Sequence, residues 1–139
     1  MRFLDTNIFL RYLTRDNEQK ARLALALLAR VERGEEKAAT SPMVILETVF
    51  TLQKRYQVPR ERIRDSLGDI ISMRGLELPN KRLYEHALDL YASKNISFAD
   101  AFNAAYMRSQ AVSEIYSWDT DFDQFENLVR LEPSEAGSP

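Results

Sequence analysis

The chain has 139 residues, which is enough for one compact domain and too few for two domains of ordinary size. It contains no cysteine, so disulfides and thiolate metal sites are excluded and a reducing compartment is favoured. A net charge of −2 argues against a basic surface all round, and no apolar run reaches the ~18 residues of a membrane span, so we expect a soluble protein of the cytoplasm.

The first half of the chain alternates short strands with helices. The predicted elements are strands at 1–5 and 37–40 and helices at 6–13, 16–34 and 41–56. Asp16 is the expected N-cap of the second helix, with Gln19 completing a capping-box pattern. Ser41 followed by Pro42 predicts the start of the third helix.

The second half continues the alternation. The predicted elements are helices at 60–73, 80–93 and 97–109 and strands at 76–78, 114–118 and 128–131. Alternating strands and helices predict an α/β fold, here a three-layer α/β/α sandwich with a short, mainly parallel, twisted sheet. We expect a single domain over residues 1–132 and a flexible tail over 133–139.

Two acidic residues follow predicted strands. Asp5 ends the first strand, where its alternative role is a helix N-cap, and Asp119 ends the strand at 114–118. Asp119, Asp121 and Asp123 would otherwise be a solvated turn, and the residues after them lack the glycine and glutamate of a calcium loop. If the two strands are neighbours, ~4.8 Å apart, Asp5 and Asp119 converge at the carboxyl edge of the sheet.

Two further acids lie on predicted apolar helices. Glu47 is on a helix that is apolar nearly all round, and a buried carboxylate needs a partner. Its alternative is an ion-paired residue on a narrow solvent stripe. Asp100 stands three residues after Ser97, so its alternative role is part of a helix cap.

Together these acids predict a metal site. Several like charges in one pocket repel one another unless cations are bound, and all-oxygen ligands suit Mg²⁺ or Mn²⁺. His86, the only histidine, is on a separate helix, which disfavours zinc and a histidine-based nucleophile. Because the chain also lacks a glycine-rich phosphate loop, the pattern favours metal-assisted phosphodiester hydrolysis.

Four segments in order along the chain resemble the PIN-domain family, and the size resembles the VapC-type toxins of toxin–antitoxin pairs. They are residues 3–7 (FLDTN), Glu47, residues 97–101 (SFADA) and residues 117–122 (SWDTDF). The resemblance implies a metal-dependent endoribonuclease that usually dimerises and is silenced by an antitoxin protein.

The resemblance also implies site residues. It gives Asp5, Glu47, Asp100 and Asp119 as the catalytic and metal-binding quartet, with Asp121 as a fifth metal ligand. Thr6, Asn7 and Ser117 would support those acids, although the family often has threonine at the position of Ser117. It gives no role to Trp118.

Basic residues near the predicted site are candidate contacts for RNA phosphates. They are Arg11 and Arg15 after the Asp5 corner and Lys54 and Arg55 at the end of the Glu47 helix. Arg60, Arg62 and Arg64 form another basic stretch. The alternative for each is a solvated helix face.

Three other functions compete with the toxin ribonuclease. One is a housekeeping PIN nuclease, and another is a non-catalytic PIN-like interaction module in an RNA-processing assembly. The third is a phosphotransfer domain of the receiver or haloacid-dehalogenase kind, which is disfavoured because Asn7 stands where a second aspartate is needed and no lysine follows Lys94.

Overall fold

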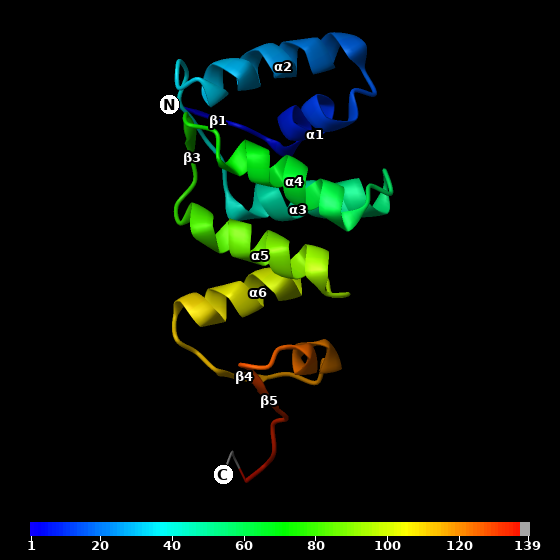
Figure 1. The fold of residues 1–139 in the computed structure, drawn as a ribbon, viewed down its shortest axis with the longest axis vertical. Coiled ribbons are helices and arrows are strands. Elements are labelled where there is room, and N and C mark those ends of the chain that lie inside the picture. Colours follow the sequence, from blue (N-terminus) through cyan, green and yellow to red (C-terminus); the bar gives the residue numbers. More distant parts are fainter. Residues whose placement is uncertain (137–139) are drawn as a thin grey trace.

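The computed structural model describes residues 1–136, and strands alternate with helices through them (Figure 1). The first elements are β1 (Arg2–Phe3), α1 (Thr6–Thr14), α2 (Glu18–Glu32), β2 (Ala38–Ala39), α3 (Pro42–Lys54), α4 (Arg60–Ile71) and β3 (Leu76–Glu77). The others are α5 (Lys81–Ser93), α6 (Phe98–Ser109), β4 (Glu114–Tyr116), the 3-10 helix η1 (Thr120–Gln124) and β5 (Val129–Leu131). The predicted α/β class with short parallel strands is confirmed.

The strands form two parallel sheets. The first has the order β1-β2-β3, with Arg2 opposite Ala38 and Ala38 opposite Leu76, and the second pairs β4 with β5. The strands β1 and β4 therefore belong to different sheets and are not neighbours within the described chain. Figure 1 shows β1 beside α1 and α2, whereas β4 and β5 lie beyond α6.

Two hydrophobic clusters hold these layers together. The smaller cluster packs α1 and α2 against the β1–β3 sheet around Phe9, Leu28 and Val31. The larger one lies between α3, α4, α5 and α6, where Tyr91 and Leu67 are fully buried. The helices stack in the order seen in Figure 1, from α2 at one end to the β4–β5 sheet at the other.

Helix caps explain where several helices begin. The hydroxyl of Ser41 accepts the N–H of Val44 at 3.3 Å, which confirms the predicted start of α3. The predicted cap of α2 is wrong: Asn17, not Asp16, accepts the N–H of Lys20, at 3.0 Å. The carboxylate of Asp16 is engaged elsewhere, because it accepts hydrogen bonds from Arg11 at 2.8 Å and from the Tyr56 hydroxyl at 2.7 Å.

Arg60 joins three elements and is a structural residue. Its Nη1 donates to the carbonyl oxygens of Tyr91 at 2.9 Å, Lys94 at 3.2 Å and Ile96 at 2.6 Å. Its guanidinium carbon also lies 4.4 Å from the centroid of the Tyr91 ring. Arg60 therefore ties the start of α4 to the α5–α6 loop, which leaves it poorly suited to the RNA contact that its basic neighbours suggested.

The described residues contain no helix that is both long enough and apolar enough to cross a membrane. The proposed division into a domain at 1–132 and a tail at 133–139 stays a prediction. Residues 137–139 of that tail lie outside the described residues.

Candidate metal centre

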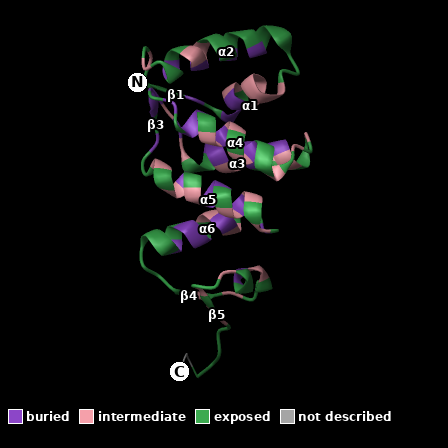
Figure 2. Ribbon diagram, viewed as in Figure 1, coloured by how far each residue is buried: buried purple, intermediate pink, exposed green. Residues whose placement is uncertain are grey.

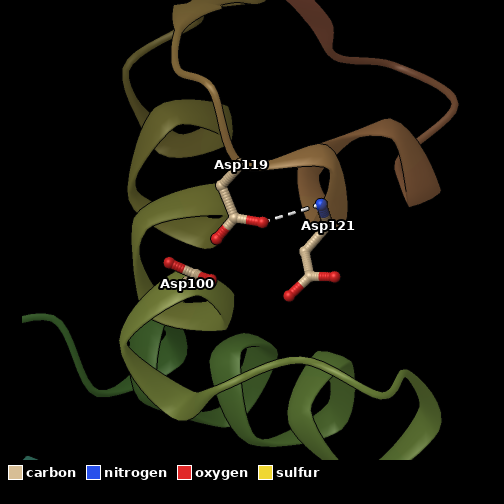
Figure 3. Close-up of side chains that lie close together, drawn as sticks. All are labelled: Asp100, Asp119 and Asp121. Atoms are coloured by element: carbon tan, nitrogen blue, oxygen red, sulfur yellow. Dashed lines mark hydrogen bonds between the residues drawn. The ribbon is translucent and has the colours of Figure 1, made fainter.

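Three of the predicted acids lie together at one surface (Figure 3). Asp100, Asp119 and Asp121 each offer a carboxylate oxygen, and these oxygens lie within 4.8 Å of one another. Asp100 comes from the first turn of α6, Asp119 precedes η1, and Asp121 is in the first turn of η1. Segments about twenty residues apart in the chain thus converge, and the three carboxylates could hold a metal ion.

Three hydrogen bonds from backbone N–H groups to side chains fix the backbone of this cluster. The hydroxyl of Ser97 accepts the N–H of Asp100 at 3.1 Å. The hydroxyl of Ser117 accepts the N–H of Asp119 at 3.0 Å, and the Asp119 carboxylate accepts the N–H of Asp121 at 2.9 Å. Ser117 thus holds the turn from which Asp119 projects, and its role in a metal site stays a prediction.

Burial and like charge act on Asp100 in the same direction. Burial raises the pKa of the Asp100 carboxyl above its usual range, and the neighbouring Asp119 and Asp121 raise it further. The hydrogen bond with Ser97 opposes this shift. A cation among the three carboxylates would replace this repulsion by attraction.

Asp5 lies outside this group of three. It occupies the N-cap position of α1, yet its side chain makes no capping hydrogen bond there, so the simple capping alternative is not supported. The next residue, Thr6, is 4 % exposed, and its hydroxyl is the buried side-chain polar atom without a hydrogen-bond partner among the described residues. Asn7 is exposed in the first turn of α1. The site roles of these three residues stay predictions.

Glu47 also lies outside the group. It is exposed on α3, between Met43, which is 70 % exposed, and Phe50, which is 60 % exposed. Glu47 is therefore not buried, and it lies on a solvent-exposed stripe of α3 together with two apolar side chains. A site role for Glu47 remains a prediction.

The four candidate RNA contacts lie where α1 and α3 end. The Tyr56 hydroxyl, just after α3, donates to Asp16, just after α1, and so brings the two helix ends together. Arg11 is ion-paired with Asp16, and the Arg55 guanidinium carbon lies 5.7 Å from the centroid of the Tyr56 ring. Arg15 and Lys54 are exposed at the same ends. In Figure 1 these ends are on the same side of the molecule as the start of α6 and η1.

Arg130 is a residue that the sequence analysis missed. From β5 it donates to the Ser117 carbonyl oxygen at 3.0 Å and to the Asp123 carboxylate at 3.0 Å. It thereby braces the turn that carries Asp119. Its signal in the sequence is an arginine inside the last predicted strand, a few residues after a run of aspartates.

The acidic cluster lies apart from a pocket of the molecule. A pocket of about 430 Å³ lies between α5, α6 and residues 124–128, and none of the five predicted acids lines it. His86 and Lys94 are half-buried in the lining of this pocket, and Arg108 is exposed beside them. A zinc role for His86 gains no support, because the acids lie elsewhere.

Comparison with known proteins places the chain in a family. Residues 2–128 match the PIN domain family. The chain is also 24% identical over 122 residues to a VapC ribonuclease from Aquifex aeolicus (strain VF5), covering 88% of this chain and 90% of that protein. Because the family match runs from the strand before Asp5 past the Asp119 turn, this chain belongs to the PIN domain family.

Proposed function

We propose that the protein is a metal-dependent endoribonuclease and acts as the toxin of a toxin–antitoxin pair. The observation that carries the proposal is the convergence of Asp100, Asp119 and Asp121 within 4.8 Å. The membership of the PIN domain family and the likeness to a VapC ribonuclease support the reaction class.

The residues at the site fit a divalent metal ion. Three carboxylate oxygens, one from each of Asp100, Asp119 and Asp121, lie close enough to hold one ion. Burial, followed by the charge of Asp119, raises the pKa of Asp100, and a bound cation would oppose that shift. Oxygen ligands of this kind suit Mg²⁺ or Mn²⁺. Such an ion, when bound, would lower the pKa of a water molecule and neutralise charge on the phosphate.

The chain's own residues have distinct roles in this proposal. Asp100, Asp119 and Asp121 hold the metal, and Asp5 and Glu47 complete the acidic set and position the attacking water. Ser117 fixes the turn of Asp119 through its hydrogen bond. Thr6 and Asn7 flank Asp5, and the unpartnered Thr6 hydroxyl is available to orient a group bound at that corner.

The basic side chains at the ends of α1 and α3 are the proposed binding surface for RNA. Arg15, Lys54 and Arg55 present positive charge at the ends of α1 and α3, on the side of the molecule where the acids lie. Arg11 contributes less, because Asp16 already neutralises it. Phosphate contacts by these side chains would offset the net negative charge of the protein.

The proposed partners follow from the likeness to the VapC ribonuclease. They are an RNA substrate, a cognate antitoxin protein that covers the acidic surface, and a second copy of the chain, all in the cytoplasm. A housekeeping PIN nuclease and a non-catalytic interaction module are the alternatives.

The test is cleavage of total RNA with Mg²⁺ or Mn²⁺, followed by mapping of the cut sites. We expect cleavage that EDTA abolishes and that Asp100→Asn or Asp119→Asn lowers by at least ~10²-fold. The matched control is Asp89→Asn, an exposed aspartate on α5, which should cut as the wild type does. RNA binding without any metal-stimulated cleavage would instead support the interaction module. Cleavage without arrest of growth when the protein is expressed would favour the housekeeping nuclease.

A further inference from the structure

The pocket between α5, α6 and residues 124–128 has the size of a ligand site. Its volume of about 430 Å³ is in the range of pockets that bind small molecules. Figure 2 shows the end of α6 and the loop that leads from it to β4 in the colour of exposed residues. Because part of that loop lines the pocket, a ligand can enter from solvent on this side.

Three side chains with nitrogen donors line the pocket. They are His86, Lys94 and Arg108, and Glu126 is the one acid among the described lining residues. His86 and Arg108 make no side-chain hydrogen bond or ion pair with any other residue that the structure describes. Lys94 donates from Nζ to the carbonyl oxygen of Gln124 at 3.3 Å, which leaves further donors on the same nitrogen. In a chain of net charge −2, this excess of donors suits an anion.

The rest of the lining suits a flat ring with polar edges. Leu90, Phe125 and Leu128 supply apolar walls, and Asn127 supplies a side-chain amide. An amide both donates and accepts hydrogen bonds, as the edges of nucleobases do. Donors for an anion, apolar walls and an amide in one pocket match the parts of a nucleotide, which are a phosphate and a flat base.

One side of α6 leads from the acidic cluster to this pocket. Asp100, Ala104 and Arg108 are spaced four residues apart, so they are neighbours along one side of the helix. Asp100 belongs to the cluster, whereas Ala104 and Arg108 line the pocket, about two turns or ~12 Å further along the helix. The 3-10 helix η1 makes the same connection, because Asp121 is in its first turn and Gln124, its last residue, lines the pocket.

We propose that the pocket binds one nucleotide, with its phosphate at Lys94 and Arg108 and its base against the apolar wall of Leu90 and Leu128. The nucleotide is an unpaired one of the RNA strand that is cut at the acidic cluster, and this part of the inference rests on the proposed nuclease function. Unpaired bases suit such a pocket, since they can be splayed out of the strand and packed against side chains. A free mononucleotide has the same chemistry, and the two sources are separated by experiment.

Two residues that each occur once in the chain make binding directly observable. His86 is the one histidine and lines the pocket, whereas Trp118, the one tryptophan, is next to Asp119. AMP, CMP, GMP and UMP are titrated into the protein in EDTA at constant pH, and the NMR signals of the His86 imidazole and the Trp118 indole are followed. We expect at least one mononucleotide to shift the His86 signal and to leave the Trp118 signal in place.

Two results of this titration would overturn the proposal. One is that none of the mononucleotides shifts the His86 signal at millimolar concentration. The other is that the Trp118 signal shifts alone, which would place the ligand at the turn of Asp119 and not in the pocket.

Arg108→Gln tests the phosphate contact. Arg108 is exposed and has no side-chain partner in the described chain, so the variant should fold normally, which circular dichroism checks. We expect it to bind the mononucleotide roughly 10-fold more weakly, because a hydrogen bond from a charged donor is lost. The matched control is Arg82→Gln, at an exposed position of α5 outside the pocket lining, which should bind as the wild type does. Equal weakening by both variants would show general charge attraction and overturn the assignment.

RNA cleavage with Mn²⁺ separates the two sources of the nucleotide. If a nucleotide of the RNA fills the pocket, Arg108→Gln should raise KM for RNA with kcat nearly unchanged. Mapping of the cut sites should then show a weaker base preference at one position away from the cut, and Arg82→Gln should show neither effect. A variant Arg108→Gln that binds the mononucleotide weakly yet cuts RNA with the KM and the cut sites of the wild type would overturn the RNA assignment.

The mononucleotide titration uses neither RNA nor metal, so it can fail independently of the proposed function. RNA cleavage without mononucleotide binding would remove the nucleotide pocket and leave the nuclease. Mononucleotide binding without RNA cleavage would do the reverse.

Discussion

At the scale of single residues, Asp100 shows how repulsion between like charges destabilises the metal-free cluster. Burial and the two neighbouring aspartates raise the pKa of its carboxyl, so its ionised form destabilises the metal-free fold near neutral pH. Asp100→Asn keeps the shape and removes this charge. We expect the variant without metal to unfold a few degrees higher than the wild type, about 1–3 °C.

Bound metal should reverse the order of the two unfolding temperatures, so that the wild type unfolds at a higher temperature than Asp100→Asn. Mn²⁺ stabilises the state that binds it, so we expect added Mn²⁺ to raise the unfolding temperature of the wild type and to leave Asp100→Asn almost unchanged. Thermal unfolding in EDTA and in Mn²⁺ measures both effects, with Asp89→Asn as the matched control. An equal rise with Mn²⁺ in the wild type and in Asp100→Asn would contradict the assignment of Asp100 as a ligand.

Asp16 gives a residue-scale prediction of the opposite sign. The hydrogen bond from Tyr56, followed by that from Arg11, lowers the pKa of Asp16 from 3.8 to about 2. A lowered carboxyl pKa stabilises the fold above the ordinary value, and this contribution is lost as the pH falls from about 3.8 towards 2. Asp16→Asn should therefore be less stable than the wild type near neutral pH, and the difference should shrink through that range.

Urea unfolding at a series of pH values checks this. Asp89→Asn, which changes an exposed aspartate on α5, serves as the control, and its difference from the wild type should stay small throughout. A gap between Asp16→Asn and the wild type that does not depend on pH would show that the contacts of Asp16 contribute by shape and not by charge.

At the scale of elements, Arg60 is the link between α4 and the α5–α6 loop. It satisfies three carbonyl oxygens that terminate or follow α5 and covers the Tyr91 ring. Arg60→Ala leaves those carbonyls without a charged donor, so we expect the free energy of unfolding to fall by about 2–3 kcal/mol. Arg62→Ala, at an exposed position of the same helix, should change it by less than ~0.5 kcal/mol.

Denaturant unfolding of the two variants measures this difference, and RNA binding adds a second readout. Arg60→Ala should bind RNA as the wild type does when both are folded, because its guanidinium is directed at the protein backbone. A loss of RNA affinity without a loss of stability would restore the phosphate-contact hypothesis for Arg60.

The positions of helices and strands were predictable where local sequence signals, such as helix caps, determine them. Ser41 and Ser97 cap the helices that their positions indicate, and every expected strand is present within a few residues. The cap of α2 was not predictable, because Tyr56, forty residues further along, takes the carboxylate of Asp16. Helix periodicity likewise did not show that Met43 and Phe50 remain exposed, since that depends on what covers α3. Tertiary contact also decides the residue just before β3, because a Cβ at Gly75 would collide with the carbonyl oxygens of Glu36 and Val31.

At the scale of the whole molecule, the acidic site was predictable in part for a related reason. Asp100, Asp119 and Asp121 converge through α6 and the turn after β4, which are close in sequence and packed together. Whether Asp5 and Glu47 join this cluster depends on which strand lies beside β1. Neither the length of a strand nor its apolar pattern determines that neighbour. The site roles of these two residues therefore stay predictions.

Mixing inactive chains separates a site built within one chain from a site shared between two chains. The proposed function assigns Asp5 and Asp119 to the same acidic set, so each chain should supply both residues. We expect Asp5→Asn and Asp119→Asn each to be inactive alone, and an equal mixture, refolded together, to stay inactive, because every chain in it lacks one of the two acids. RNA cleavage with Mn²⁺ measures the recovery.

The matched control mixes Asp100→Asn with Asp119→Asn, whose carboxylate oxygens lie within 4.8 Å of each other in one chain. That mixture should also stay inactive, because each chain lacks one acid of its own cluster. Recovery with the first pair and not with the second would require that Asp5 and Asp119 come from different chains, and it would contradict a site built within one chain.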